Sequence, residues 1–261
     1  MNNREEAVTL VIGLGEVGKP LYAILKRHDP SAIGIDVDPV TVNAPVGVMH
    51  ICFPFIDSAQ FKSAVVGYVR KYNPKVVVIN STAMPGTTRD IESEIGTPCV
   101  YSPVRGKHTR MADELLTYVK FVAGTDAKAT ELVREHFRAA AMNSEFMSAP
   151  EALELAKLLE TTYFGMLIAW AQEMNRFAVA LDADYLEVGE FFREIAYLPS
   201  VLFQPGYIGG HCVMPNIGLL QQRFQSEFLD VVKRSNEARR AELAGQEQKG
   251  AGERLKPLEQ A

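Results

Sequence analysis

The sequence has few cysteines, no long apolar run and no excess of basic residues. Its three cysteines follow no regular spacing, which argues against a disulfide framework and a structural metal site. No apolar stretch reaches the roughly 18 residues that a membrane-spanning helix needs. The first residues, MNNREE, are polar, unlike a signal peptide. A formal net charge of −5 argues against a nucleic-acid partner. These absences predict a cytoplasmic protein without a membrane segment or a metal ion.

The start of the chain carries a glycine-rich motif in a specific context. Residues 7–12 (AVTLVI) are typical of a buried strand, and residues 20–26 are typical of a helix. Between them stands GLGEVG, which has the G-x-G-x-x-G spacing of a dinucleotide site. Gly13 allows the tight turn, Gly15 the approach of a pyrophosphate, and Gly18 close packing of helix and strand. Glu16 and Val17 lie where the helix N-terminus faces the phosphates.

A second predicted strand, residues 32–37, carries Asp36 about twenty residues after the glycines. A carboxylate at this place accepts hydrogen bonds from both ribose hydroxyls and repels a 2′-phosphate, which predicts NAD rather than NADP as cofactor. The alternative is a surface acid at the end of a strand.

Further short apolar runs predict an α/β fold with a Rossmann-like doubly wound sheet over residues 1–148. The next run, residues 47–53, follows within about ten residues, and a parallel crossover normally takes a dozen or more. We therefore expect the third β-α unit to be trimmed. Residues 102–108 (SPVRGKH) form a basic loop in which Arg105 and Lys107 can hold anionic substrate groups or face solvent.

The pattern changes at Pro150, where an apolar helix of roughly 30 residues begins. It predicts that residues 149–240 form a helical domain with one long central helix and a last helix from Ile217 to about Arg240. A charged, disordered tail over 241–261 is expected to follow. A helix of this length and apolarity is suited to a homodimer seam. Lys157 in this stretch is either a surface lysine with a buried stem or a buried catalytic ammonium.

A second glycine-rich loop lies at residues 205–216 (PGYIGGHCVMPN) and contains Cys212. Gly209 and Gly210 let the backbone approach a ligand closely. Cys212 is either a nucleophile presented to a pocket or a buried cysteine beside a tight turn.

Together these stretches resemble the nucleotide-sugar 6-dehydrogenases, which oxidise a sugar C6 alcohol to a uronic acid with two NAD. The resemblance rests on five motifs in the family's order. Four are G-L-G-x-V-G-x-P-L at 13–21, S-T-x-x-P-G-T at 81–87, S-P-E-R at 102–105 and E-L-A-K at 154–157. The fifth is PGYIGGHC at 205–212, which resembles the nucleophile loop P-G-x-x-V-G-G-H-C. It implies that Cys212 forms a thiohemiacetal and then a thioester. It implies that Lys157 stabilises the oxyanions, and that Thr82 and Thr161 position water or the substrate hydroxyl.

The sequence departs from the family pattern at three of these positions. Val104 replaces the S-P-E-R glutamate, Thr161 replaces the asparagine four residues after the lysine, and Asn216 replaces the aspartate four residues after the cysteine. The chain also ends where the family's third, nucleotide-binding domain starts, so we expect a short form. Three interpretations remain open. The first is an active NAD-dependent dehydrogenase of this family that acts on a truncated or unusual substrate and belongs to polysaccharide biosynthesis. The second is a two-electron hydroxyacid-type dehydrogenase, and the third is a non-catalytic descendant that binds NAD or a partner. The sequence leaves the substrate open.

Overall fold

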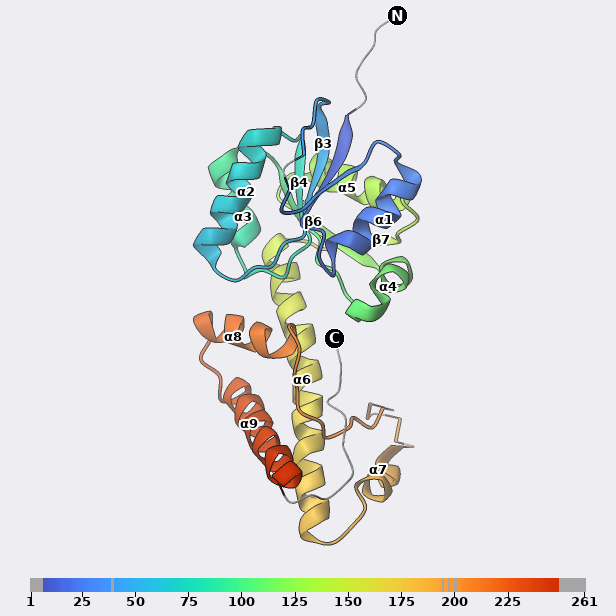
Figure 1. Ribbon diagram of the computed structural model, residues 1–261, viewed down its shortest axis with the longest axis vertical. Helices are drawn as coiled ribbons and strands as arrows, with labels where there is room; N and C mark the ends of the chain where they lie inside the picture. Colours follow the sequence, from blue (N-terminus) through green and yellow to red (C-terminus); the bar gives the residue numbers. More distant parts are fainter. Residues whose placement is uncertain (1–6, 39, 194, 197, 200, 249–261) are drawn as a thin grey trace, which may run out of the picture. The chain divides into compact units, whose positions relative to one another are not determined.

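The computed structural model describes residues 7–38, 40–193, 195–196, 198–199 and 201–248. Contacts between Cα atoms divide the chain into two compact units, Met1–Lys157 and Leu158–Ala261 (Figure 1). The predicted boundary at residue 148 stays a prediction. Within the described residues, no helix is long and apolar enough to cross a membrane.

The first unit is built on a seven-stranded sheet. Neighbouring strands are parallel except β5 and β6, which are antiparallel. In spatial order the strands are β2 (Ile33–Ile35), β1 (Val8–Ile12), β3 (Val46–Ile51), β4 (Val76–Ile79), β5 (Cys99–Tyr101), β6 (Lys120–Gly124) and β7 (Ser144–Phe146).

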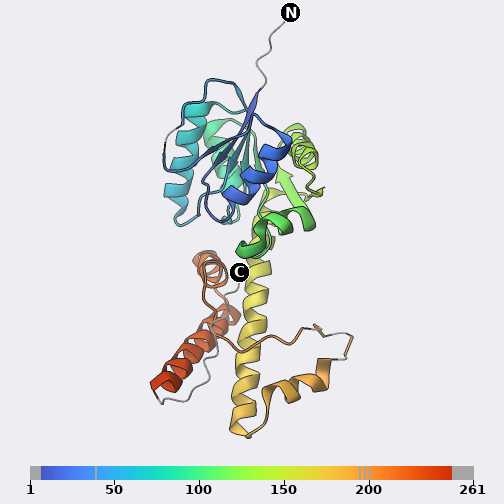
Figure 2. The ribbon, with the colours of Figure 1, turned by 45° about the vertical axis from the view of Figure 1, so that its right-hand side comes forward.

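Helices cover both faces of this sheet, as Figures 1 and 2 show. One face carries α2 (Ser58–Tyr72) and α3 (Thr87–Ile95), and the other carries α1 (Gly18–His28), α4 (Met111–Thr117) and α5 (Ala127–Ala139). Strand β1 shows why, because Leu10 and Ile12 pack into one apolar cluster and Val11 into the other. A strand buried on both faces needs a continuous apolar run, which residues 8–12 supply.

The predicted doubly wound sheet is therefore confirmed, including its trimmed third unit. The residues described between β2 and β3 form no helix. The chain passes from β1 to one side at β2 and resumes on the other side at β3, which creates a topological switch point between β1 and β3. Open α/β sheets bind ligands outside the carboxyl ends of the strands at such a point. The predictions missed α3 and α4, two short helices that follow motif loops.

The second unit is helical. Its helices are α6 (Pro150–Ala180), which begins in the last residues of the first unit, α7 (Tyr185–Arg193), α8 (Val213–Arg223) and α9 (Glu227–Gln248). The predicted long helix is confirmed as α6. The predicted single helix from Ile217 to about Arg240 is wrong, because the chain leaves helical geometry at Phe224–Ser226 and forms α8 and α9. Helix α9 also continues through residues 241–248, where we expected a disordered tail, and residues 249–261 lie outside the described part.

Candidate active site

The glycine-rich loop after β1 has the geometry that its sequence predicts. Gly13 has a φ of +87°, and a Cβ added to it would lie 2.8 Å from the Phe53 nitrogen. A Cβ on Gly18 would lie 1.7 Å from the Gly13 oxygen, so only glycine lets α1 start this close to the loop. By contrast, no atom lies within 4 Å of a Cβ placed on Gly15. The loop thus leaves open space at the glycine that is expected to face a pyrophosphate.

Two carboxylates lie in or beside this loop. Asp36 follows β2, is exposed, and accepts a 3.3 Å hydrogen bond through Oδ1 from the Leu14 nitrogen. Glu16, within the loop, contacts His108, with 2.5 Å between Oε2 and Nδ1. This contact joins the glycine-rich loop to the basic loop. Helix α1 carries no acidic residue in its first turn, which begins just after Val17. Its positive N-terminus therefore suits an anion.

The basic loop is held by contacts within the first unit. Arg105 donates from Nη2 to the Val119 oxygen at 2.5 Å, and its guanidinium lies 5.1 Å from the centre of the Phe121 ring. The Lys107 nitrogen donates to Glu114, whereas the Lys107 side chain is exposed. Val104, at the position of the family glutamate, is buried among apolar side chains. Arg105 is therefore already engaged, and Lys107 is the more accessible cation for a substrate.

Lys120 is a buried lysine that belongs to none of the sequence motifs. Its ammonium donates to Asn80 Oδ1 at 3.2 Å, to the Pro103 oxygen at 3.1 Å and to the Ser102 oxygen. Burial is the main cause that lowers the pKa of Lys120 to about 7. A lysine opening an otherwise apolar strand (KFVAG) was the available signal. Through these bonds Lys120 holds the Ser102–Pro103 backbone that leads to Arg105.

Asn80 continues this buried polar chain towards α5. Its Nδ2 lies 3.2 Å from His50 Nδ1, and His50 Nε2 lies 3.0 Å from His136 Nε2. Burial lowers the pKa of both imidazoles, to about 4 for His136. Both rings are therefore neutral at pH 7, which avoids placing two further positive charges near Lys120.

Glu154 joins two of the sequence motifs. Its fully buried carboxylate accepts hydrogen bonds from the Gly86 nitrogen at 2.6 Å, the Thr88 nitrogen at 2.9 Å and Thr88 Oγ1 at 2.7 Å. It thereby caps α3, which begins within the S-T-x-x-P-G-T motif, and burial raises its pKa. The half-buried Thr82 lies on the same loop, and Lys157 lies three residues after Glu154 on α6. Glu154 therefore has a structural task that its place in the E-L-A-K motif did not reveal.

In the second unit, two of the positions that depart from the family pattern are partners of each other. Asn216 Nδ2 donates to Thr161 Oγ1 at 2.8 Å, and Thr161 Oγ1 donates to the Leu158 oxygen at 3.0 Å. Both side chains are buried. The two substitutions therefore form one neutral hydrogen-bonded pair between α6 and α8.

Cys212 occupies the N-cap position of α8. It is half-buried, whereas Cys52 and Cys99 are buried, and burial raises the pKa of the Cys52 thiol to about 12. Helix N-termini stabilise thiolates, and α8 has no acid in its first turn. Gly210, two residues earlier, has a φ of +76°, which explains the need for glycine there. Cys212 is therefore the least buried of the three cysteines and lies at the N-terminus of a helix.

The predicted site residues divide between the two units. The first unit holds the glycine-rich loop, Asp36, Thr82, Arg105, Lys107 and Lys157, and the second holds Thr161, Gly209, Gly210, Cys212 and Asn216. The described residues contain no group of three histidine, cysteine, aspartate or glutamate side chains that could hold a metal ion.

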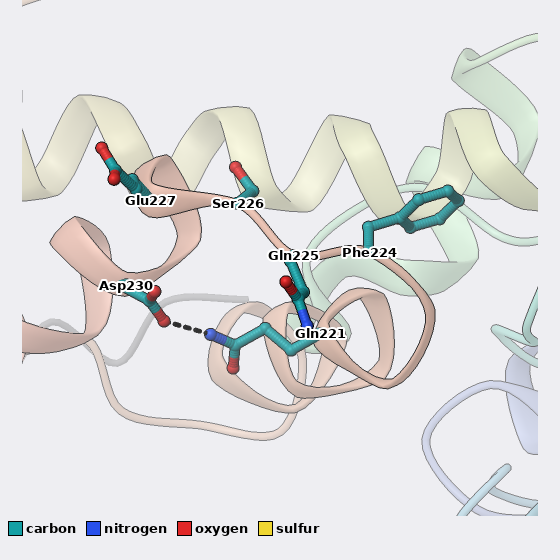
Figure 3. A pocket seen from close by; sticks show the side chains of 6 residues that line it. All are labelled: Gln221, Phe224, Gln225, Ser226, Glu227 and Asp230. Carbon is teal, nitrogen blue, oxygen red and sulfur yellow. Dashed lines mark hydrogen bonds between the residues drawn. The ribbon is translucent and has the colours of Figure 1, made fainter.

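A pocket between α8 and α9 lies apart from these residues (Figure 3). Its lining is polar except for one ring and contains no predicted site residue: Gln221, Phe224, Gln225, Ser226, Glu227 and Asp230. A 2.7 Å hydrogen bond from Gln221 Nε2 to Asp230 Oδ1 crosses it. It carries none of the proposed chemistry.

Comparison with known proteins supplies the family context. Residues 151–239 match the central domain of the UDP-glucose/GDP-mannose dehydrogenase family. The predicted resemblance to nucleotide-sugar dehydrogenases is thereby confirmed. A relative in Methanocaldococcus jannaschii, UDP-N-acetyl-D-mannosamine dehydrogenase, is 23% identical over 251 residues, which cover 78% of this chain and 58% of the relative. The enzyme of the same name in Pyrococcus horikoshii is 28% identical over 184 residues, which cover 65% of this chain and 43% of that relative. The chain thus spans little more than half the length of the first of these relatives.

Solved structures show the same fold. The UDP-N-acetyl-D-mannosamine dehydrogenase structure from Pyrococcus horikoshii has a TM-score of 0.80 at 20% identity, covering 93% of this chain and 71% of that one. A Pyrobaculum islandicum UDP-glucose dehydrogenase has a TM-score of 0.79 at 17% identity, and the match covers 96% of this chain and 73% of that one. Mycobacterium tuberculosis 3-hydroxyisobutyrate dehydrogenase has a TM-score of 0.69 at 15% identity, covering 91% and 94%. At these identities the likeness concerns the fold alone.

Proposed function

We propose that this protein is an NAD-dependent dehydrogenase that oxidises the C6 primary alcohol of a sugar nucleotide through a covalent intermediate on Cys212. The observation that carries the proposal is the half-buried Cys212 thiol at the N-terminus of α8, after a glycine-rich loop. This loop lies within the segment that matches the family's central domain. A two-electron alcohol oxidation has no need of such a thiol. A nucleophile that captures an aldehyde permits a second oxidation.

The first unit fits a dinucleotide. Bound NAD would accept the hydride that leaves the substrate carbon. The open space at Gly15 and the acid-free first turn of α1 suit its pyrophosphate. Asp36 is held next to the loop by the Leu14 nitrogen and suits the ribose hydroxyls.

The proposed chemistry balances over two oxidations. Loss of a hydride and a proton from the alcohol gives an aldehyde, to which the Cys212 thiolate adds as a thiohemiacetal. Loss of a second hydride, which a second NAD would accept after the first NADH has left, gives a thioester. Water then opens the thioester to the acid and the regenerated thiol. The family resemblance assigns oxyanion stabilisation to Lys157 and placement of water or the hydroxyl to Thr82 and Thr161.

Opening the thioester is the step for which this chain is least equipped. Val104 cannot accept a proton, and Asn216 is neutral and already donates to Thr161. General-base assistance is typically worth about 10²–10⁴-fold, so its loss slows hydrolysis more than hydride transfer. We therefore expect the adduct on Cys212 to accumulate.

The test is stopped-flow measurement of NADH formation with a panel of UDP-sugars that includes UDP-N-acetylmannosamine, followed by intact-mass analysis. A burst followed by slow turnover, with an adduct that is absent in Cys212→Ala, supports the proposal. Steady turnover without a burst that persists in Cys212→Ala contradicts it.

That second outcome would favour a two-electron hydroxyacid-type dehydrogenase. Such an enzyme is consistent with the fold likeness to 3-hydroxyisobutyrate dehydrogenase, because that match covers nearly the whole of both chains. Binding of NAD without turnover of either substrate class would favour a non-catalytic descendant. A place in polysaccharide biosynthesis and a cytoplasmic location are further parts of the main proposal.

We also propose that α6 forms the seam of a homodimer. Four large apolar side chains on this helix are 49–58% exposed: Leu159, Tyr163, Trp170 and Phe177. Spacings of four and seven residues place them on one face of the helix. An apolar stripe of this length on a monomer favours self-association.

A further inference from the structure

The loop that carries Cys212 is anchored upstream by a buried amide from α9. Asn236 Oδ1 accepts from the Ile208 nitrogen at 2.7 Å, and Asn236 Nδ2 donates to the Ile208 oxygen at 3.0 Å. Both residues are buried. A single side chain thus pairs with both backbone groups of one loop residue, as a neighbouring strand would do, and fixes its position and orientation.

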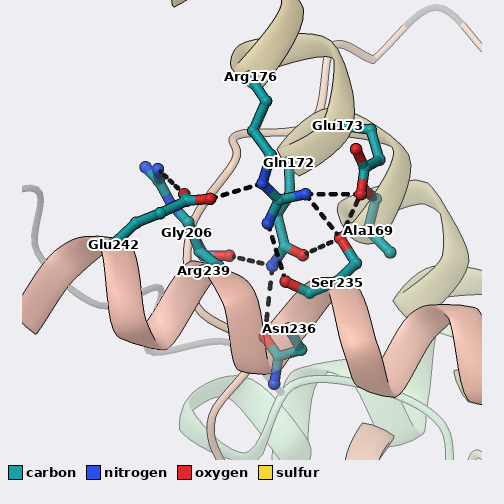
Figure 4. A network of polar contacts seen from close by, with 9 residues as sticks. All are labelled: Ala169, Gln172, Glu173, Arg176, Gly206, Ser235, Asn236, Arg239 and Glu242. Carbon is teal, nitrogen blue, oxygen red and sulfur yellow. Dashed lines mark hydrogen bonds and ion pairs between the residues drawn. The ribbon is translucent and has the colours of Figure 1, made fainter.

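A second amide, from α6, holds the same loop two residues earlier. Gln172 Nε2 donates to the Gly206 oxygen at 2.7 Å and lies 3.3 Å from Asn236 Oδ1. Its Oε1 accepts from Ser235 Oγ at 2.9 Å, so its amide orientation is fixed (Figure 4). Gln172 is fully buried. We call Gln172 and Asn236 the amide clamp.

The rest of the network supports the clamp without touching the loop. Arg176 Nη2 donates to the Ser235 oxygen at 2.9 Å, and its Nε pairs with Glu242 at 2.5 Å (Figure 4). Glu242 also pairs with Arg239 at 3.0 Å. These contacts hold α6 and α9 together and provide a matched control, because they stabilise the helices but make no bond to residues 205–212.

Only three residues separate Ile208, which the amide clamp holds, from Cys212. Downstream of Cys212, α8 packs tightly on α6, since a Cβ on Gly165 would lie 2.5 Å from Val213 Cγ1. Between these two anchors stand Gly209, Gly210 and His211, which are glycines or exposed. A glycine pair has too much conformational freedom to position the thiol by itself. The placement of Cys212 therefore depends on the anchors on either side.

We propose that Gln172 and Asn236 are positioning residues for the Cys212 nucleophile, acting through the Gly206 and Ile208 backbone. This role rests on the proposed function, because it matters only if Cys212 reacts. Neither amide touches the thiol. A misplacement of a reacting group by about 1 Å can cost about 100-fold in rate.

The test measures the reactivity of Cys212 without any substrate. Asn236→Ala removes both bonds to Ile208, and Asn236→Asp keeps the acceptor but loses the donor. Glu242→Gln serves as the control. Each protein is treated with iodoacetamide, and alkylation of each cysteine is followed by peptide mass spectrometry. Cys52 and Cys99 are buried in the first unit and report its unfolding, whereas the fluorescence of Trp170, the only tryptophan, reports unfolding of the second unit, which contains the clamp.

We expect Cys212 in Asn236→Ala to be alkylated about tenfold faster than in the unmodified protein, while Cys52 and Cys99 stay protected. Asn236→Asp should lie in between, and Glu242→Gln should match the unmodified protein. In turnover with the substrate, kcat should fall about 100-fold with little change in KM. If Asn236→Ala unfolds, the rate of Cys212 alkylation in the near-isosteric Asn236→Asp, compared with the unmodified protein, serves as the test instead.

Unchanged alkylation of Cys212 in folded variants of Asn236 would overturn the proposal and leave the clamp a purely structural contact. An equal change in Glu242→Gln would overturn it too, because the effect would then arise from helix packing. The two proposals fail separately. Absence of turnover with every sugar nucleotide, together with the expected change in alkylation, would refute the proposed function and leave the clamp in place.

Discussion

Replacing Lys120 by methionine tests the buried polar chain of the first unit. The lysine is 3% exposed and donates to Asn80, Ser102 and Pro103. Methionine has a similar volume but no donor. At pH 8 the Lys120 amine, with a pKa of about 7, is mostly neutral and has two N–H donors, so two buried acceptors lose a partner. A buried group left unsatisfied costs about 1–3 kcal/mol. Relief from burying the amine offsets part of this cost, so we expect Lys120→Met to lower the free energy of unfolding by about 3 kcal/mol at pH 8.

The dependence on pH is the sharper part of this test. Burial lowers the pKa of Lys120 from 10.5 to about 7, the charges of Arg105 and Lys157 act in the same direction, and Cys52 opposes them. Between these two values the unfolded chain binds a proton that the folded chain does not, so the unmodified protein gains stability as the pH rises. The slope is at most about 1.4 kcal/mol per pH unit. The variant lacks this titrating group, so its free energy of unfolding does not gain this increment. The difference in free energy of unfolding between the two proteins should therefore widen by about 2 kcal/mol from pH 7 to pH 9.

The assay is urea unfolding at a series of pH values, followed by circular dichroism. Fluorescence is unsuitable, because Trp170, the only tryptophan, lies in the second unit. Lys128→Met, at an exposed position of α5, is the matched control and should show no such widening. If the difference in free energy of unfolding between the unmodified protein and Lys120→Met stays constant or narrows as the pH rises, the lowered pKa of Lys120 is refuted.

Three further predictions concern the cofactor, the assembly and the chemistry. Asp36→Ala should abolish the preference for NAD over NADP in calorimetry, and tighter binding of NADP by the unmodified protein would contradict the role of Asp36. Trp170→Glu should turn the expected homodimer into a monomer in light scattering, whereas an unmodified protein that is already monomeric would speak against the α6 seam. Asn216→Asp should speed acid release after the NADH burst by up to about 100-fold, because a carboxylate can accept a proton from water. It should also destabilise the protein by about 1–3 kcal/mol through loss of the donor to Thr161, and an unchanged slow phase would show that hydrolysis is limited elsewhere.

Local pattern was sufficient to predict that the first unit contains a doubly wound sheet and a glycine-rich loop, although β7 was missed. The continuous apolar run of β1, the helix that follows it and the spacing of Gly13, Gly15 and Gly18 each depend on neighbours within a few residues. The same holds for α6, whose start at Pro150 and unbroken apolar pattern are local properties. The break between α8 and α9 was missed, because residues 224–226 contain no glycine or proline to mark it.

The partners of the site residues were decided by tertiary structure alone. Asn216 and Thr161 are 55 residues apart, Glu154 and the start of α3 about 66, and Asn236 and Ile208 are 28 apart. Sequence identified Thr161 and Asn216 as departures from a motif but not as hydrogen-bonding partners of each other. It also marked Cys212 as a candidate nucleophile without revealing the amides that hold its loop. A side chain's periodicity records which face of a helix or strand it lies on, whereas its hydrogen-bond partner depends on which elements the fold packs against that face.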